Sequence, residues 1–305
     1  MIKINVSNET AQLKAVIVGI ADDFGGIPDL EECYDPKSKE HVQLGTFPSE
    51  NDCLLSMKIL VEVLEKYNVD VYRPKNIKGL NQIFSRDIAF VIGDRLILPN
   101  IIEDRRKELG AISSVLDMVG VSQKIKMPKD SRLEGGDVIL WNEYIFVGYS
   151  EKEDFEKYKV ARTNSAGLNF LVDTFSNKKV MGFELNKSDN DPRNNVLHLD
   201  CCFQPIGKDM AVLYKDGFKN NQDVKFLMDI FGKEKIIEIT REEMYKMTAN
   251  LFSISEEVIV SEKGFVKLNT ELRERGFIVE EVSYAEIGKM SGLFRCSTMP
   301  LIRKV

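Results

Sequence analysis

Histidine, tryptophan and cysteine are scarce in this chain of 305 residues, which has two histidines, one tryptophan and five cysteines. The cysteines are Cys33, Cys53, Cys201, Cys202 and Cys296. They include no CxxC pair and are odd in number, which argues against a disulfide framework and a structural zinc site. This cysteine usage predicts a protein of the reducing cytoplasm.

Long apolar runs and an excess of positive charge are also absent. No segment approaches the length that spans a bilayer, and the polar first residues do not match a secretory signal. The formal net charge of -6 gives no electrostatic reason to expect nucleic acid or an anionic membrane as a partner. With 43% hydrophobic and 30% charged residues, the composition is typical of a soluble globular protein.

The sequence does contain a repeated pattern of apolar stretches. Five of them, beginning at Leu13, Asp87, Asp137, Asp200 and Leu251, combine apolar runs with a polar turn. In the middle three, two β-branched or aromatic runs flank the turn, which predicts a β-hairpin. Helical spacing follows in segments 54–64, 164–175, 224–230 and 268–275, and each leads into another β-rich segment. We therefore expect an α/β fold of repeated ββαβ-like modules in a single domain, residues 1–305.

Polar residues recur at the start of the predicted strands. They are Arg86 and Asp87, Glu134 and Asp137, His198 and Asp200, Asn250, and finally Arg295 and Cys296. If the modules surround a common axis, equivalent strand starts converge and these side chains meet. The paired glycines after Glu134 would let the backbone turn or pass close to a ligand. Taken singly, each motif also has a structural explanation, as a solvated ion pair, an acidic turn or a buried histidine with a polar neighbour.

Two of these positions carry side chains suited to catalysis. His198 and Asp200 are two residues apart, so on a strand they project from one face and could form a general acid–base with its electrostatic partner. Cys296 lies in a polar segment beside Arg295, whereas we interpret the other four cysteines as inert core residues. A neighbouring cation favours the thiolate, which predicts that Cys296 is a nucleophile.

Five motifs together resemble the guanidino-group-modifying enzymes. They are FSRD (84–87), EGGD (134–137), HLD (198–200), AN (249–250) and RCSTMPL (295–301), in the order in which that superfamily has them. The superfamily includes arginine deiminase, glycine amidinotransferase, agmatine deiminase and dimethylarginine dimethylaminohydrolase, and the resemblance covers essentially the whole chain. It implies a pseudo-fivefold α/β propeller, the pentein fold, with no cofactor and no metal.

The resemblance also implies a role for each matched residue. Cys296 would attack the guanidinium carbon, and His198 would protonate the leaving amine and then activate water or an acceptor amine. Asp87 and Asp200 would grip the guanidinium nitrogens. Glu134, as a further acidic contact, and Asp200 count with Cys296 and His198 as catalytic residues. The remaining matches are substrate contacts: Asp137 as an acid, Arg105 and Arg162 at an amino-acid carboxylate, Asn250 at the α-amino end, and Arg295 beside the nucleophile. Several carboxylates suit a planar cation with many N–H donors.

Some features separate the members of the superfamily. The segment HLDCCFQPIG is nearer the amidinotransferases, whereas CSTMPLIR is nearer the deiminases, and the chain is shorter than the arginine deiminases. Dimethylarginine dimethylaminohydrolase usually lacks an acid at the position of Asp200, so the resemblance ranks that activity lower. The expected partner is thus a small arginine-like guanidino compound. The substrate, the choice of water or an amine as acceptor, the oligomeric state (a homodimer is compatible) and the role of segment 22–49 stay open.

Two other functions remain as alternatives. One is a metal-dependent hydrolase that uses His198, Asp200, Glu134 and Asp137 as ligands. The other is a protein on the same fold that binds arginine-like ligands, or a protein partner, without catalysis. Insensitivity to chelators would argue against the first, and release of ammonia, urea or ornithine would argue against the second.

Overall fold

The computed structural model, which describes residues 1–304, contains five sheets of three strands each. In every sheet the central strand pairs antiparallel with one neighbour and parallel with the other. At least one helix lies in sequence between the two parallel strands. The expected ββαβ order is therefore confirmed, and the chain has a mixed α/β fold.

Four sheets are built from consecutive strands. They are β3 (Phe90–Ile92), β4 (Arg95–Leu98) and β5 (Lys124–Lys126); β6 (Val138–Trp141), β7 (Tyr144–Tyr149) and β8 (Lys179–Glu184); β9 (Phe203–Ile206), β10 (Met210–Leu213) and β11 (Ile236–Glu238); and β12 (Phe252–Ser253), β13 (Val258–Glu262) and β14 (Ile278–Val282). The first two strands of each form a hairpin. Gly93 and Asn142 adopt positive φ angles of 58° and 50° in two of these tight turns, a conformation that Gly and Asn tolerate well.

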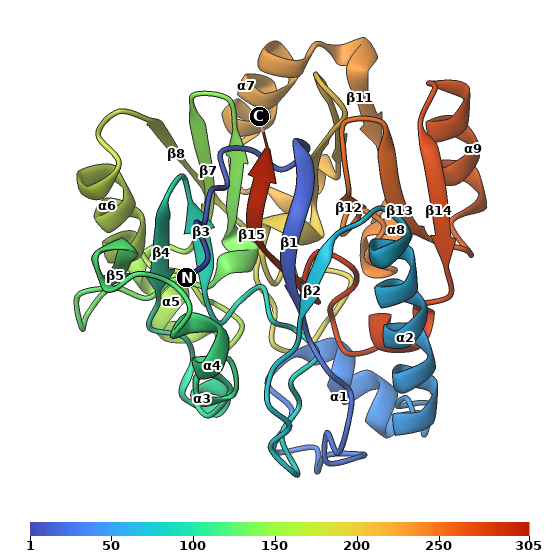
Figure 1. Cartoon of the computed structure of the whole chain (residues 1–305). Helices are drawn as coiled ribbons and strands as arrows, with labels where there is room; N and C mark the ends of the chain where they lie inside the picture. Colours follow the sequence, from blue (N-terminus) through green and yellow to red (C-terminus); the bar gives the residue numbers. More distant parts are fainter. Residues whose placement is uncertain (305) are drawn as a thin grey trace.

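The remaining sheet joins the two ends of the described chain. Its central strand, β1 (Gln12–Val18), pairs parallel with β2 (Asp70–Tyr72) and antiparallel with β15 (Thr298–Lys304). Figure 1 shows β15, in red, directly beside β1, in blue. The first module therefore has no hairpin of its own, because the strand that completes it comes from the other end of the sequence.

Helices and short 3-10 turns connect the strands. The longer helices are α1 (Pro36–Gln43), α2 (Glu50–Lys66), α6 (Ser165–Thr174), α7 (Asn221–Phe231) and α9 (Val266–Glu274). The shorter ones are α3 (Glu108–Ala111), α4 (Ser113–Leu116), α5 (Lys152–Lys157), α8 (Arg241–Tyr245) and α10 (Ala285–Gly288). Four of the longer helices coincide with the segments of helical spacing to within one to four residues at each end, and α1 lies in segment 22–49, for which the sequence predicts no element. In α2, Ser49 caps the first turn, and Met57, Leu60 and Leu64 are buried at helical spacing.

The hydrophobic core has two parts, and β1 separates them. Alternate side chains of β1 point to opposite faces, so Val16 and Val18 belong to the larger cluster, whereas Ala15 and Ile17 belong to the smaller one. Leu13 breaks this alternation and joins the larger cluster, because the pairing of β1 with β15 shifts register between Leu13 and Val16. No helix within residues 1–304 is both long enough and apolar enough to cross a membrane.

Candidate active site

The polar motifs meet because backbone hydrogen bonds join the segments that precede the strands. The N–H group of Arg86 donates to the carbonyl of Cys296 at 3.0 Å, and that of Gly135 donates to the carbonyl of Asp87 at 3.4 Å. The N–H group of Cys296 donates to Asn250 Oδ1 at 3.1 Å. Residues up to 210 positions apart in sequence therefore lie in contact, as expected for equivalent strand starts that converge.

His198 contacts acidic residues from two other modules. Its Nε2 lies 2.9 Å from Glu134 Oε2, and its Nδ1 lies 3.7 Å from Asp87 Oδ1. Burial lowers the pKa of His198, but the carboxylates of Asp87, Asp137 and Glu134 outweigh this effect and raise the pKa to about 9. His198 is therefore an imidazolium near neutral pH, and Nδ1 has no hydrogen-bond partner.

The predicted pairing of His198 with Asp200 is wrong. Residues Leu199–Cys201 form a 3-10 turn, η4, that begins immediately after His198, so the two side chains do not share the face of a strand. Glu134 takes the place of Asp200 as the hydrogen-bonded partner of the imidazole. Asp200 instead faces Cys296, with its Oδ2 atom 3.7 Å from Cys296 Sγ.

Cys296 is buried beside the amide of Asn250 and the carboxylate of Asp200, and the guanidinium of Arg295 does not contact its thiol. Its Sγ accepts a hydrogen bond from Asn250 Nδ2 at 3.2 Å. Burial, followed by the nearby carboxylates of Asp200 and Asp87, raises the pKa of the thiol well above its usual range. The expectation that Arg295 favours the thiolate is therefore wrong for the protein without ligand, because the guanidinium of Arg295 points elsewhere.

Arg295 bridges two buried carboxylates. Its Nη1 donates to Asp200 Oδ2 at 2.9 Å, and its Nη2 donates to Glu9 Oε1 at 3.0 Å. Burial raises the pKa of Glu9, but the attraction of Arg295 and Arg86 dominates and lowers it to about 2. Arg295 thus orients Asp200, which differs from the substrate contact expected for it. Sequence reasoning missed Glu9, because it lies in an ordinary polar segment near the start of the chain.

Arg105 and Arg162 are also held by protein groups. Arg105 donates to Asp87 Oδ2 at 2.6 Å and contacts Glu108 with both Nε and Nη2, each at 2.8 Å. Arg162 Nη1 lies 3.3 Å from Glu134 Oε2. Both arginines reach the site, but in this state they orient its carboxylates. Glu108 was not predicted, although its i,i+3 spacing from Arg105 is a recognisable signal.

Asp137 and Asn250 organise the backbone of the site. Asp137 Oδ1 accepts a hydrogen bond from the N–H group of Leu199 at 2.9 Å, and Oδ2 accepts one from Thr163 Oγ1 at 2.7 Å. Both oxygens of Asp137 are therefore engaged, and burial raises its pKa. Asn250 Oδ1 accepts from the N–H groups of Leu293 and Cys296, so it holds the segment that carries the thiol.

The two glycines after Glu134 lie against neighbouring protein groups with no room for a side chain. A Cβ atom on Gly136 would lie 2.7 Å from His198 Nδ1 and 2.8 Å from Asp87 Oδ1. A Cβ atom on Gly135 would lie 2.1 Å from the carbonyl oxygen of Arg86. Neither glycine has a positive φ angle, so close packing explains both positions.

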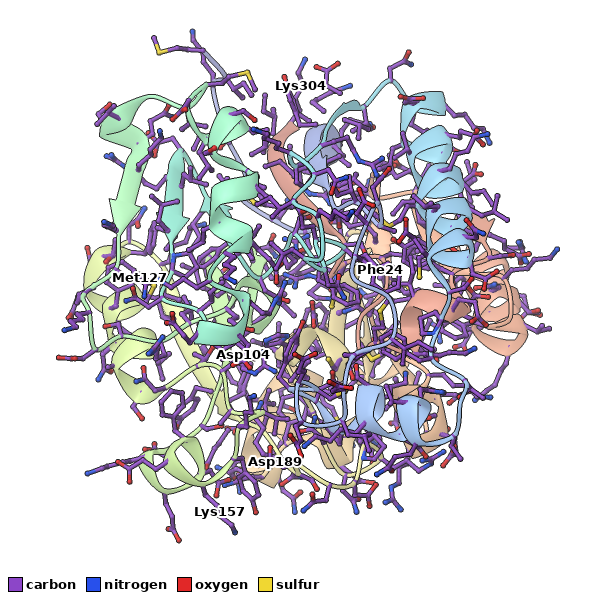
Figure 2. The ribbon with its side chains drawn as sticks, turned by 90° about the horizontal axis from the view of Figure 1, so that it is seen from below. Phe24, Asp104, Met127, Lys157, Asp189 and Lys304 are labelled. Carbon is purple, nitrogen blue, oxygen red and sulfur yellow. The ribbon has the colours of Figure 1, made fainter. Side chains whose placement is uncertain are left out.

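Segment 22–49 packs against the site from outside. The carbonyl of Tyr34 accepts a hydrogen bond from Arg162 Nη2 at 2.9 Å, and the carboxylate of Asp35 accepts one from Ser291 Oγ. Figure 2, a view from below, shows Phe24 of this segment near the middle of the face. Cys296 and His198 are only 2% and 1% exposed, so the site is closed in this conformation.

A metal ion would meet a different set of ligands from the one expected. Ligand atoms of Asp87, Glu134 and His198 lie within 4.8 Å of one another, whereas Asp200 is held by Arg295. Each of the two carboxylates already has an arginine partner, and the raised pKa of His198 favours its protonated form, which cannot ligate. The carboxylates of Asp87 and Glu134 are therefore better suited to a protonated His198 than to a metal ion.

Three solved structures have the same fold as this chain. The N-terminal domain of ArgZ, an arginine dihydrolase from cyanobacteria, superposes with a TM-score of 0.79 and 18% identity, over 95% of this chain and 98% of that one. The amidinotransferase SxtG of Microseira wollei gives 0.77 and 19%, over 100% and 98%. DDAH from Pseudomonas aeruginosa, in complex with citrulline, gives 0.73 and 18%, over 95% and 99%.

Comparison of sequences identifies the family. Arginine deiminase of Bacillus cereus (strain ATCC 10987 / NRS 248) is 26% identical over 270 residues, 73% of this chain but only 62% of that enzyme. The uncharacterized protein YkgA of Bacillus subtilis (strain 168) is 31% identical over 247 residues, 80% of this chain and 78% of that protein. A family model described as "N,N dimethylarginine dimethylhydrolase, eukaryotic" matches residues 39–303. The chain belongs to this family, within the guanidino-group-modifying enzymes.

Proposed function

We propose that this protein breaks a C–N bond of an arginine-like guanidino compound through a covalent amidino intermediate on Cys296. The observation that carries the proposal is the position of the Cys296 thiol, 3.7 Å from Asp200, in the same buried site as the His198 imidazolium and its acids. We also propose that residues 1–305 form one catalytic domain, with the five modules arranged about a pseudo-fivefold axis. Pairing of β1 with β15 supports this arrangement.

The carboxylates of Asp87 and Asp200 would bind the guanidinium. Asp87 lies beside His198 and Asp200 beside Cys296, so a planar cation between the two acids would have its carbon near sulfur and one nitrogen near the imidazolium. Arg105 and Arg295 hold these acids by ion pairs of 2.6 and 2.9 Å. The site thus presents oriented acceptors before the substrate arrives.

Binding of the cation would also activate the thiol. In the protein without ligand, burial and the nearby carboxylates keep Cys296 protonated. A guanidinium cation placed on those carboxylates offsets their repulsion, so the thiol can release its proton to solvent as the substrate binds. The thiolate would then add to the guanidinium carbon, and His198 would give its proton to the departing amine from the unpartnered Nδ1.

The second half of the reaction would use the neutral imidazole left by the first. His198 would take a proton from water, or from an acceptor amine, as the oxygen or nitrogen attacks the amidino carbon. Collapse of that adduct breaks the C–S bond and returns the thiolate. With water, the products are a urea-type compound and an amine or ammonia; with an amine, the product is a new guanidino compound. Entry of any substrate requires movement of segment 22–49, since Cys296 is buried.

Mass spectrometry of the acid-quenched protein tests this proposal. Incubation with a panel of L-arginine, methylated arginines and agmatine should add an amidino group to Cys296 for the true substrate, and analysis of the solution identifies the released amine. Cys296→Ser should abolish both signals while circular dichroism stays unchanged. Cys201→Ser is a matched control, because Cys201 is buried beside the same Asp200, with its thiol 3.7 Å from Oδ1. Full turnover in Cys296→Ser would refute the mechanism.

A metal-dependent hydrolase is the second candidate, favoured only by the cluster of Asp87, Glu134 and His198. It predicts stoichiometric metal in the purified protein and loss of turnover with a chelator. Ligand binding without any released amine would instead indicate a non-catalytic binder.

A further inference from the structure

A cavity separate from the candidate active site lies beside helix α1. Its volume is about 310 Å³, within the range of small-molecule sites. Residues from α1, the end of α8, the start of α9, and α10 line it: Lys37, His41, Tyr245, Lys246, Glu262, Gly264, Phe265, Ala285, Gly288 and Lys289. None of the residues assigned to the candidate active site is among them.

Lys37 is a buried cation without an acidic partner. It is 5% exposed, and its ammonium group takes part in no ion pair within residues 1–304. Burial lowers the pKa of Lys37 to about 8, and the charge of Asp35 opposes this effect only in part. Nζ donates one hydrogen bond, to the carbonyl of Tyr245 at 2.5 Å, and lies 4.6 Å from the centre of the Tyr245 ring. An ammonium group has three N–H donors, and a buried charge is costly unless it is paired. The position of Lys37 therefore favours an anion in the cavity.

The acids around the cavity are already engaged. Glu262 accepts hydrogen bonds from the N–H groups of Gly264 and Tyr284. Glu286 pairs with Lys289 at 2.6 Å. Glu40, on α1, pairs with Arg193 at 3.0 Å and accepts a hydrogen bond from the hydroxyl of Tyr245. Asp35, the acid whose charge acts most strongly on Lys37, accepts hydrogen bonds from the backbone N–H groups of Lys37 and Ser38. Lys37 therefore has no ion-paired counter-ion at this cavity.

We propose that this cavity binds a small organic carboxylate, with its anionic group on Lys37 and its apolar part against Phe265 and Ala285. The rim adds a second cation, Lys246, which is exposed. A single negative charge fits better than a phosphate dianion, because the carboxylate of Glu262 also lines the cavity. Tyr245 and Phe265 are among the lining residues, and their aromatic side chains favour a ligand with an apolar body.

The occupant would hold α1 in place. Lys37 and His41 line the cavity from α1, whereas Lys246 and Lys289 belong to other segments, so a bound carboxylate joins α1 to them. Three residues before Lys37, Tyr34 contacts Arg162 of the candidate active site. The ligand would therefore stabilise the closed position of segment 22–49. The binding step does not depend on the proposed catalytic function.

Isothermal titration of the whole protein with benzoate, without any guanidino compound, tests the site. We expect a dissociation constant of roughly 1 mM or tighter, and inorganic phosphate should bind at least about tenfold more weakly. Lys37→Met should weaken benzoate binding at least about tenfold, whereas Lys263→Met, at an exposed lysine that does not line the cavity, should not change it. Absence of benzoate binding, equal binding of phosphate, or an unchanged constant in Lys37→Met would overturn the proposal.

A cavity-filling variant separates loss of the site from misfolding. Ala285 is exposed at the rim, so Ala285→Trp should occupy the cavity without disturbing the core, and it should abolish benzoate binding while Lys37 is intact. Hydrogen exchange then tests the link to segment 22–49. Benzoate should slow exchange of the amides of α1 in the wild-type protein, and binding without this protection would refute the stabilising role.

Discussion

Replacing Glu134 by glutamine tests the charge balance that keeps His198 protonated. The substitution preserves the size of the side chain and its acceptor oxygen, but it removes the negative charge that lies 2.9 Å from His198 Nε2. Asp87 and Asp137 remain to attract the imidazolium. The pKa of His198 should therefore fall without returning fully to the value for an isolated histidine.

The expected decrease in the pKa of His198 follows from its direct contact with Glu134. Loss of one adjacent opposite charge lowers a histidine pKa by about 1 to 2 units. From a pKa of about 9, such a change reduces the imidazolium fraction at pH 8 from about 90% to about 50% or less. Because the pKa is raised in the folded state, the stabilisation from His198 is complete below about pH 6.5 and is lost as the pH rises through about 9. In the variant, this loss should occur at lower pH.

The assay is an NMR titration of ring-labelled histidine, which is simple here because the chain has only two histidines. His41→Gln assigns the signals, and burial lowers the pKa of His41, so the two midpoints should be well separated. Glu103→Gln, at an exposed glutamate, is the matched control. A wild-type midpoint for His198 below pH 7, or the same midpoint in Glu134→Gln, would show that the reasoning is wrong.

Three further substitutions test the supporting contacts. Gly136→Ala places a methyl group 2.7 Å from His198 Nδ1 and should lower kcat by about 100-fold or more in steady-state kinetics, whereas Gly110→Ala, with open space around it, should not. Glu9→Gln leaves Arg295 with one carboxylate and should lower the free energy of unfolding, measured in urea at pH 7, by about 3 kcal/mol. Because the pKa of Glu9 is lowered in the folded state, this difference in stability between wild type and variant should vanish as the pH falls through about 2. Asn250→Ala removes the N–H donor to Cys296 Sγ and the acceptor for two backbone N–H groups. It should therefore reduce kcat more than it raises KM, and an unchanged kcat would argue against a role of Asn250 at the thiol.

Local patterns in the sequence were sufficient for most of the elements. The spacing of Met57, Leu60 and Leu64 predicts one face of α2, and turns such as the one at Asn142 predict the hairpins. These signals are short-range, because they depend on residues within one or two turns of each other. Pairing of β1 with β15 carries no such signal, since it joins opposite ends of the chain.

For the site, the sequence by itself identified most of the segments that contribute, and the structure added Glu9 and segment 22–49 and decided what each side chain contacts. Asp87, Glu134, His198, Asn250 and Cys296 do meet, as the repeated modules predicted. Their partners were not predictable, because hydrogen bonds between modules depend on how whole sheets are positioned. His198 pairs with Glu134 instead of Asp200, and Arg295 reaches back to Glu9.

The charge state of the Cys296 thiol shows the same difference between what the sequence predicts and what the structure decides. A sequence motif places Arg295 next to Cys296, but neighbours in sequence can point in opposite directions, and here the guanidinium faces Glu9 and Asp200. Burial and the surrounding carboxylates then raise the pKa of the thiol. Residue order determined the chemistry that is available, whereas only the tertiary structure determined the electric field in which it acts, because that field is the sum over residues distant in sequence.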